Sequence, residues 1–468
     1  MERAEIHRMR DQNPAVEEAA RYLDQIPKFS REKHTMEDLR RMIAVLGVNP
    51  ETYQMIHIAG TNGKGSVCAF LSSILRESGC HTAVFTSPHL VSVKERFCFD
   101  GQSVEDECFL RAFHRVKDST AEFEKAGAGH PTYFEYLFLM FLLMLSEKPA
   151  DYVILETGLG GRLDATNCIK APVLTVITSI SMDHMEYLGH TIPEIAGEKA
   201  GILKPLVPVI YDTSDDAAAA VIQKKAEELG CPALPVGNCC CGSVRLPDGR
   251  LSFSPVFPAQ WQERWTEEGG PDRLSVPFAA EYQAANAALA LCAAMQLKLS
   301  PMAVAEGIRR TVWPGRMEEI RDGVYIDGAH NEGGILAFAS SARKIAQQRG
   351  GRRILLFAVV SDKEYREMAE ILLREFAPEV LILTQIQYGR GLALERLEEA
   401  ARETFVRRQE ECGTKESLPE KLLVIPTVRE ALQEALREKK EKDTVFCAGS
   451  LYLVGEIKEA VKEEENGE

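Results

Sequence analysis

The sequence predicts an α/β protein built from two domains, residues 1–298 and residues 299–468. A chain of 468 residues exceeds the size at which one hydrophobic core usually stops growing. Short apolar runs alternate with longer helix-like stretches, which is typical of a mainly parallel sheet covered on both faces. The alternation is interrupted and then restarts after LKLSPM, residues 297–302, so we expect a smaller α/β domain to follow the first.

In the first domain we expect strands at TYQMIHIA, TAVF, DYVILE and APVLTVITSI. A helix is expected from Ser66 to about Ser78, directly after the first strand. In residues 206–277 the alternation of strand-like and helix-like stretches stops. We expect this segment to form an irregular, β-rich region with a hairpin in RLPDGRLSF. A long helix from about Glu281 to Leu297 should close the domain.

The second domain repeats the alternation with five strand-like runs: GVYIDGAH, RRILLFAVV, PEVLILTQI, KLLVIPT and DTVFCAGS. Helix-like stretches separate these runs, so a Rossmann-like α/β unit is predicted, although it lacks a GxGxxG motif. The charged segments near 399–420 and 435–443 are typical of solvated surface.

Composition argues against several classes of protein. The net charge of −15 disfavours nucleic-acid binding, which needs clustered Lys and Arg. The longest apolar run, Tyr136 to Leu145, is about half of a membrane span, and a buried helix is expected there. The N-terminus lacks the apolar core of a secretory signal. The 12 cysteines lack metal spacing, and the run from Cys239 to Cys241 is too crowded for ordinary disulfides. A cytoplasmic protein with reduced thiols is therefore expected.

The segment HIAGTNGKGSV, residues 57–67, has the composition of a phosphate-binding loop. It departs from the strict P-loop pattern, because only two residues separate Gly60 from Gly63 and Gly65 precedes Ser66. The loop could be a glycine-rich turn that binds nothing. Its place between a strand and a helix favours nucleotide binding, with backbone amides and Lys64 facing the phosphates. The first domain is therefore predicted to be P-loop ATPase-like.

A second group of polar residues follows the strand DYVILE. Glu156 ends this strand and could deliver a metal ligand to the carboxyl edge of the sheet. The segment GLGGR, which contains Arg162, and then Asp164 and Asn167, add polar groups near the same edge. A lone acid after a strand is usually a surface turn residue, but the phosphate loop upstream favours metal binding.

Three further segments carry candidate residues. His184 follows another strand and could reach the same edge or be a structural residue. Lys199 in EKAGI would by default face solvent. In the second domain, Arg316 comes before an expected strand, and Asp327, His330 and Asn331 come just after it. An Asp-Gly pair is usually a turn, but four polar groups here indicate a ligand surface facing a cleft.

Taken together, the motifs resemble the Mur ligase superfamily and, within it, the folylpolyglutamate synthase and dihydrofolate synthase family. GTNGKGS, TSPHL, PTYFEY, GLGGRLDATN, the SMDH and EKAGI pair, PGRME, DGAHN and GSLYLVGE occur in the family's order. They extend from about residue 57 to residue 456, nearly the whole chain. Two departures occur: Tyr282 stands where the family usually has histidine, and Glu332 replaces the proline after DGAHN.

The resemblance implies a role for each group of residues. It implies that ATP is bound by Gly60, Thr61, Asn62, Gly63, Lys64, Gly65 and Ser66 together with Asn286, Arg316 and Asp327. It implies that Mg²⁺ is bound by Ser87, Glu156 and His184, and that a carbamylated Lys199 could hold a second divalent ion. It implies that the substrate is contacted by Thr132, Tyr133, Phe134, Glu135, Arg162, Asp164 and His330. Lys64, Lys199 and His184 would be the catalytic residues.

The implied reaction joins L-glutamate to a folate, or to dihydropteroate, and we expect a bifunctional enzyme. A substrate carboxylate would attack the γ-phosphate of ATP, and the amine of glutamate would convert the acyl phosphate into an amide. Domain closure should protect this intermediate from water. The resemblance also implies a monomer whose partners are small molecules. Two alternatives remain: a cell-wall precursor ligase, which PTYFEY and GLGGRLDATN disfavour, and a nucleotide-binding regulator without ligase chemistry.

Overall fold

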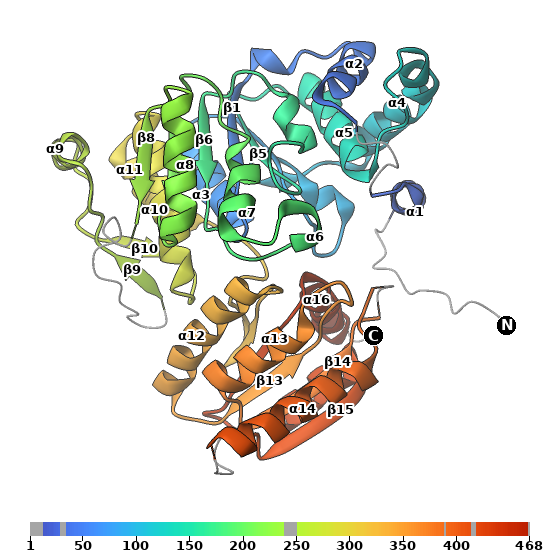
Figure 1. The fold of residues 1–468 in the computed structure, drawn as a ribbon, viewed down its shortest axis with the longest axis vertical. Helices are drawn as coiled ribbons and strands as arrows, with labels where there is room; N and C mark the ends of the chain where they lie inside the picture. The colour runs from blue at the N-terminus through green and yellow to red at the C-terminus, as the bar shows by residue number, and fades with distance from the viewer. Residues whose placement is uncertain (1–12, 29–33, 238–249, 388–389, 413–417, 467–468) are drawn as a thin grey trace.

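The computed structural model describes residues 13–28, 34–237, 250–387, 390–412 and 418–466, which form two α/β units stacked one above the other (Figure 1). The first unit contains an eight-stranded sheet in the order β4-β3-β2-β5-β1-β6-β7-β8, and the second a six-stranded sheet in the order β11-β12-β16-β13-β14-β15. Most neighbouring strands are parallel, and β3, β4 and β11 pair antiparallel. The predicted α/β class with mainly parallel sheets is confirmed.

The elements of the first unit have the following bounds. Its main sheet consists of β1 (Gln54–Ala59), β2 (Thr82–Phe85), β3 (Phe97–Phe99), β4 (Gln102–Ser103), β5 (Tyr152–Glu156), β6 (Leu174–Ile177), β7 (Val209–Asp212) and β8 (Ala233–Val236). The helices are α1 (Pro14–Gln25), α2 (Met36–Leu46), α3 (Lys64–Glu77), α4 (Asp106–Lys125), α5 (Tyr133–Glu147), α6 (Met185–Leu188), α7 (Ile192–Ala200), α8 (Asp216–Glu228), α9 (Ala259–Glu267), α10 (Tyr282–Gln296) and α11 (Pro301–Arg310). A separate hairpin pairs β9 (Leu251–Phe253) with β10 (Leu274–Val276).

The second unit is smaller. Its strands are β11 (Glu318–Arg321), β12 (Val324–Ile326), β13 (Arg353–Phe357), β14 (Val380–Gln385), β15 (Lys421–Thr427) and β16 (Thr444–Ala448). Its helices are α12 (Glu332–Arg349), α13 (Tyr365–Ile371), α14 (Leu394–Cys412), α15 (Val428–Glu438) and α16 (Leu451–Asn466).

Strand β1 lies between β5 and β6 and is covered on both faces, which explains its nearly continuous apolar sequence. Ile56 and Ile58 belong to the core beneath α3 and α10, whereas Met55 packs on the opposite side with α5. The predicted buried helix at Tyr136 to Leu145 is part of α5. Because the strands are parallel, the carboxyl ends of β1, β5 and β6 meet at one edge of the sheet and face the second unit.

The prediction of an irregular region over residues 206–277 is wrong for its first part. Strand β7, helix α8 and strand β8 form a regular β-α-β unit that extends the main sheet. These strands are only four residues long and are flanked by prolines, so their pattern is weak in the sequence. Residues 238–249, which include the Cys239 to Cys241 run and most of RLPDGRLSF, lie outside the described residues; Leu251–Phe253 pairs with Leu274–Val276 instead.

Helix α11 follows the predicted domain boundary at residue 299 but packs against α3 of the first unit. Val304 and Ile308 are fully buried in the same core as Ile74 on α3. A Cβ atom at Gly307 would lie 2.4 Å from the Cα of Ile74, so the two helix backbones touch there. From this packing we propose that the passage between the units lies after α11, at residues 311–317, rather than at residue 299.

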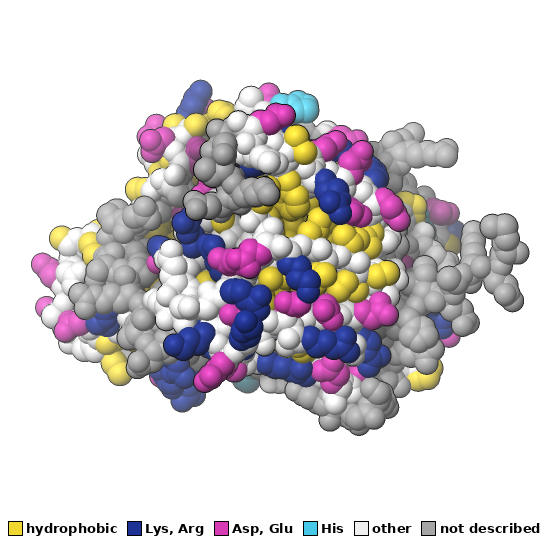
Figure 2. Space-filling view, turned by 90° about the horizontal axis from the view of Figure 1, so that it is seen from below, with side chains coloured by type: hydrophobic (Ala, Val, Ile, Leu, Met, Phe, Trp, Pro, Cys, Tyr) yellow, Lys and Arg dark blue, Asp and Glu magenta, His cyan; other side chains and the backbone are white. Residues whose placement is uncertain are grey.

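The amino ends of the second unit's strands carry ion pairs. Arg352 and Asp443 lie 2.9 Å apart, and Arg353 pairs with Glu379 at 2.5 Å. Figure 2 shows the molecule from below, where basic and acidic side chains lie side by side around a band of hydrophobic side chains. The structure shows free thiols at Cys68, Cys80, Cys98, Cys108, Cys168, Cys231, Cys292 and Cys447. Within the described parts of the chain, no helix has the length and apolar character needed to cross a membrane.

The α3–α11 contact yields a stability prediction. Gly307→Ala should lower the free energy of unfolding by roughly 1–3 kcal/mol, because the added methyl group meets backbone atoms that cannot rotate away. Urea denaturation of both proteins measures the difference. Gly197→Ala is the matched control, since a Cβ at this helical glycine meets nothing within 4 Å. Equal losses in the two variants would contradict the proposed backbone contact.

Candidate active site

A cavity of about 500 Å³ lies where the carboxyl edges of the two sheets face each other. The structure brings residues from both units to its walls, although they are far apart in the sequence. The residues predicted from the sequence that line this cavity are Gly60, Thr61, Asn62, Gly63, Lys64, Gly65, Ser66, Ser87, Glu156, His184, Lys199, Asn286, Arg316, Asp327 and His330.

The backbone of the phosphate loop needs glycine at two positions. Gly60 has a φ of +151° and lies so close to Thr178 that a Cβ would fall 1.8 Å from its Oγ1. Gly63 has a φ of +92°, and a Cβ there would fall 2.2 Å from Oδ1 of Asn286 on α10. Helix α3 begins at Lys64, so its first amide groups point into the cavity as an anion would require.

Two lysines converge on one carbonyl group of this loop. Lys64 Nζ donates to the Gly60 carbonyl oxygen at 3.0 Å, and Lys199 Nζ donates to the same oxygen at 2.7 Å. Lys199 is only 4% exposed, so the default expectation that it faces solvent is wrong. Burial and then the neighbouring Lys64 charge lower the pKa of Lys199 to about 7. A substantial share of Lys199 is therefore the neutral, nucleophilic amine near neutral pH.

The residues predicted to bind Mg²⁺ lie around the same cavity. Glu156 is 4% exposed, and its Oε2 accepts a hydrogen bond from the Ser87 amide at 3.0 Å. Burial raises the pKa of Glu156, and Lys64 opposes this. Burial also lowers the pKa of His184, whose backbone has a left-handed φ of +51°. A neutral imidazole can ligate a metal.

The described residues contain no group of three or more His, Cys, Asp or Glu that could hold a metal ion by themselves. A Mg²⁺ ion commonly keeps waters and phosphate oxygens as ligands, so one carboxylate and one hydroxyl would be enough protein ligands on a bound nucleotide. The donor set of Glu156, Ser87 and His184 is thus compatible with Mg²⁺ on a bound nucleotide, and its metal-binding role stays a prediction.

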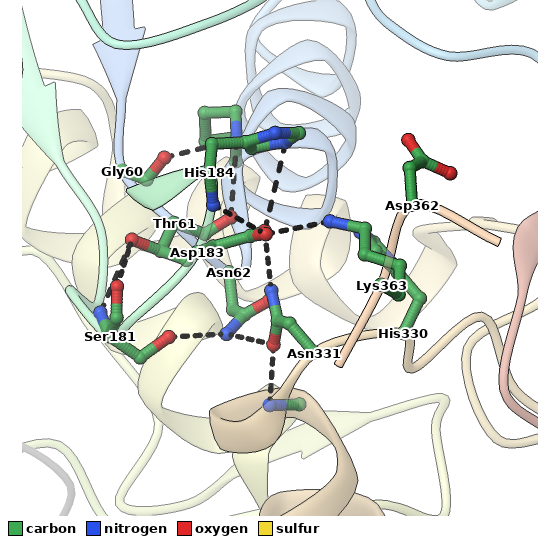
Figure 3. A network of polar contacts seen from close by, with 12 residues as sticks. Gly60, Thr61, Asn62, Ser181, Asp183, His184, His330, Asn331, Asp362 and Lys363 are labelled. Carbon is green, nitrogen blue, oxygen red and sulfur yellow. Dashed lines mark hydrogen bonds and ion pairs between the residues drawn. The ribbon is translucent and has the colours of Figure 1, made fainter. Parts of the chain in front are cut away.

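A network of polar contacts joins the phosphate loop to the second unit (Figure 3). Asp183 accepts from Lys363 Nζ at 2.6 Å and from Asn331 Nδ2 at 2.8 Å. Asn331 and Asn62 exchange two amide hydrogen bonds, each of 3.1 Å. Although burial opposes it, the Lys363 charge holds the pKa of Asp183 below its usual value.

Sequence reasoning missed Asp183 and Lys363. Lys363 lies in VSDKE, six residues after the end of β13, and its place in the loop that follows a buried strand was the available signal. Asp183 directly precedes His184 in SMDH, and only the histidine was predicted to be a site residue. Asn331, considered from the sequence, caps α12 by accepting from the Gly334 amide at 2.9 Å.

Tyr282, which replaces the family's usual histidine, donates a short hydrogen bond to Oδ2 of Asp327. The Asp327 carboxylate also accepts from the amides of Met317 and Ala329, both at 2.8 Å. Burial raises the pKa of Asp327, and the nearby Arg316 charge opposes this. Asp327 is therefore held firmly by protein groups, and its predicted contact with the nucleotide stays a prediction.

His330 lines the cavity from the second unit. Its Nδ1 lies 2.7 Å from the Gly328 carbonyl oxygen, which requires Nδ1 to carry the proton and leaves Nε2 as an acceptor. Burial lowers the pKa of His330 to about 4, so the ring is neutral at pH 7.

The other predicted substrate residues do not line this cavity. Glu135 pairs with His34 at 2.8 Å. Its carboxylate also accepts a hydrogen bond from the amide of Thr132, the N-cap residue, and this interaction caps the start of α5. Arg162 pairs with Glu198 at 2.9 Å on the surface. The remaining members of the set are Tyr133 and Phe134 on α5 and Asp164, which lies two residues after the GLGGR segment. Their substrate contacts stay predictions.

The GLGGR loop connects these residues to the cavity. Asp164 is buried and accepts from the amides of Gly158 and Leu159 at 2.8 and 2.9 Å, so it fixes the backbone that lines the cavity. Phe134 lies against Gly158, where a Cβ would fall 2.7 Å from its ring. Phe134 and Asp164 therefore act on the cavity wall from behind.

Residues 58–294 match the Mur ligase middle domain, and residues 315–451 match the glutamate ligase domain of Mur ligases. The dihydrofolate synthase/folylpolyglutamate synthase of Bacillus subtilis (strain 168) is 32% identical over 434 residues, which cover 91% of this chain and 94% of that protein. The solved Mycobacterium tuberculosis folylpolyglutamate synthase complexed with ADP and AMPPCP superposes with a TM-score of 0.80 at 25% identity, covering 96% of this chain and 98% of that one.

A second solved structure, E. coli FolC in complex with DHPP and ADP, gives a TM-score of 0.74 at 27% identity and covers 96% of this chain and 98% of that one. Both matching domains contribute walls to the cavity described above. This chain therefore belongs to the folylpolyglutamate synthase and dihydrofolate synthase family of Mur ligases.

Proposed function

We propose that this protein is an ATP-dependent ligase that joins L-glutamate to folates and also to dihydropteroate. The observation that carries the proposal is a single cavity in which the phosphate loop of one unit faces Arg316 and His330 of the other. The relatives named as folylpolyglutamate and dihydrofolate synthases support the choice of substrates. The cytoplasmic location, the monomeric state and the absence of macromolecular partners stay predictions.

The first step brings two anions together, a substrate carboxylate and the γ-phosphate of ATP. Lys64 and the free amides at the start of α3 stabilise the phosphate charge and fix its position. A Mg²⁺ ion held by Glu156, Ser87 and His184 would neutralise phosphate charge when bound, and a second divalent ion could use a carbamylated Lys199. Both units wall the cavity, and their further closure over it would shield the acyl phosphate from water.

The second step needs the amino group of glutamate in its neutral form, because an ammonium ion has no lone pair. His330 is a neutral imidazole in the cavity with Nε2 as an acceptor, so it can take a hydrogen bond from the incoming amine. Amine attack on the acyl carbon forms the amide bond and releases inorganic phosphate. Lys363, which pairs with Asp183, lies close enough to His330 for its positive charge to help keep that imidazole neutral.

The competing functions make different use of the same cavity. A regulator needs a nucleotide site but has no need of a second unit that places His330 and Lys363 beside the phosphate loop. A cell-wall precursor ligase would share this arrangement. Product analysis with defined acceptors separates all three.

The substrate prediction is tested with a panel of acceptors. Purified protein with ATP and Mg²⁺ is supplied with tetrahydrofolate, dihydropteroate or a UDP-muramyl peptide, each with its amino acid, and products are identified by mass spectrometry. We expect glutamate addition to the first two acceptors and ADP release only when acceptor and glutamate are both present. Slow ADP release that ignores glutamate would favour the regulator, and a muramyl product would favour the cell-wall ligase.

Charge removal at the phosphate loop should stop the reaction without unfolding the protein. Lys64→Ala and Glu156→Ala should each lower glutamate incorporation by at least about 10²-fold, through lost phosphate stabilisation and lost metal binding respectively. Circular dichroism monitors the fold, and Lys224→Ala on the exposed side of α8 is the matched control. Removing divalent ions with EDTA should abolish turnover, and added Mg²⁺ should restore it. Normal turnover in the Lys64 or Glu156 variant would refute the assignment.

The buried amine of Lys199 predicts a pH-dependent stability. Its folded pKa of about 7 lies below the ordinary lysine value of 10.5, so between these pH values the unfolded chain binds more protons. The stability of the wild type relative to Lys199→Met should therefore rise with pH across this window, measured by urea unfolding in CO₂-free buffer. A flat difference would show that Lys199 titrates normally.

Carbamylation of Lys199 is tested separately by NMR with ¹³C-bicarbonate. A carbamate signal in the wild type that is missing in Lys199→Met would assign the modification to Lys199.

A further inference from the structure

Gly65 departs from the strict P-loop pattern, and its backbone conformation does not explain why a glycine stands at this position. Its φ lies outside the left-handed region, and it occupies the second position of α3, where alanine is normally well tolerated. A Cβ at Gly65 would lie 2.6, 3.1 and 3.4 Å from Cζ2, Cε2 and Nε1 of Trp313. These three nearest atoms all belong to one indole ring, so the side chain of Trp313 occupies the space that a residue at position 65 would need.

Trp313 lies in the linker between α11 and β11, where the chain passes from one unit to the other. Its indole is half-buried and packs against the core of the first unit. Thr311, two residues earlier, is fixed on α11 by donating its hydroxyl to the Gly307 carbonyl oxygen at 2.8 Å. The first half of the linker is thus attached to the unit that carries the phosphate loop.

The second half of the linker is attached to the other wall of the cavity. The Gly315 carbonyl oxygen accepts from the Gly328 amide at 2.9 Å, next to Asp327. Arg316 lines the cavity, and its guanidinium lies so close to Gly328 that a Cβ there would fall 2.2 Å from Nη1. Within four residues, therefore, the linker contacts the phosphate loop at Trp313 and the strand end of the second unit at Gly315 and Arg316.

We propose that Trp313 is a positioning residue that seats the domain linker on the phosphate loop. Gly65 is kept without a side chain to receive the indole, rather than to let a phosphate approach. The contact fixes the start of α3 and the position of Arg316 together, so a nucleotide in the loop meets both halves of its site in register. This role rests on the proposed ATP-dependent function and adds a residue that neither the loop motif nor the reaction requires.

The alternative explanation of Gly65 is that a phosphate approaches it closely. The two explanations predict different nucleotide affinities for the variant that carries both substitutions, Gly65→Ala and Trp313→Ala. If the indole is the obstacle, Gly65→Ala is harmful only while Trp313 is present. If the phosphate is the obstacle, removing the indole brings no relief. Residues in direct contact show such coupling, whereas independent sites have additive effects.

A double-variant cycle tests the proposal through binding of ATP and of AMPPCP, each with Mg²⁺, measured by calorimetry on the full chain. Gly65→Ala should weaken binding roughly tenfold or more by overpacking. Trp313→Ala should raise the KM for ATP more than it lowers kcat, and Trp313→Phe should retain part of the function. In Gly65→Ala with Trp313→Ala, affinity should return to that of Trp313→Ala alone. Additive losses, or unchanged binding in Gly65→Ala, would overturn the proposal.

Two controls separate this role from general destabilisation. Gly197→Ala places a methyl group in open space on α7 and should bind nucleotide like the wild type. In wild-type protein labelled with 5-fluorotryptophan, AMPPCP should shift the ¹⁹F signal of Trp313, assigned with Trp313→Phe, more than those of Trp261 and Trp265 on α9. An unmoved Trp313 signal at saturation would contradict the contact. Nucleotide affinity and the ¹⁹F shift need no ligation, so these two readouts stand even if the acceptor panel identifies a different reaction, whereas the KM and kcat comparison depends on turnover.

Discussion

The concentration of positive charge at one backbone carbonyl is the constraint on which the rest of the site depends. Lys64 and Lys199 both donate to the Gly60 oxygen, and Lys199 is nearly fully buried. Two ammonium groups this close, away from water, repel each other and are stable only with anions nearby or with one amine neutral. The protein supplies Glu156, and the lowered pKa of Lys199 provides the neutral amine. A nucleotide phosphate, or a carbamate on Lys199, would relieve the remaining imbalance.

The second unit adds its own charges to the same arrangement. Asp183, from the first unit, accepts hydrogen bonds from Lys363 and Asn331 of the second, and Asn331 also holds Asn62 of the phosphate loop. Each of these side chains is at least partly buried, so breaking the contact between the units would leave polar groups without partners. The position of the phosphate loop and the position of the second unit are therefore energetically linked before any ligand binds.

The sequence predicts the parts of the site that follow from local pattern. Lys64 was found because it belongs to a glycine-rich loop between a strand and a helix, and Glu156 because a polar residue at the end of a buried strand must lie at the sheet edge in a parallel fold. Long-range contacts leave no such local signal: Lys363 meets a partner 180 residues away, and Trp313 meets Gly65 through a linker that looks like an ordinary turn. The regular β-α-β unit at 206–236 was missed for a related reason, because its short strands gain their stability from neighbours in the sheet.

The exchange at Tyr282 shows why a departure from a family motif is judged from its contacts. The phenol reaches Asp327, a carboxylate already bound by two backbone amides, and completes its set of donors. A buried carboxylate that lacked one donor would be costly, so either a tyrosine or an imidazole could satisfy this position. What the position requires is a hydrogen-bond donor of the right length on α10, and that requirement links the first unit to Asp327 at the strand end of the second. The residue type can change while the mechanical connection between the two walls of the cavity is preserved.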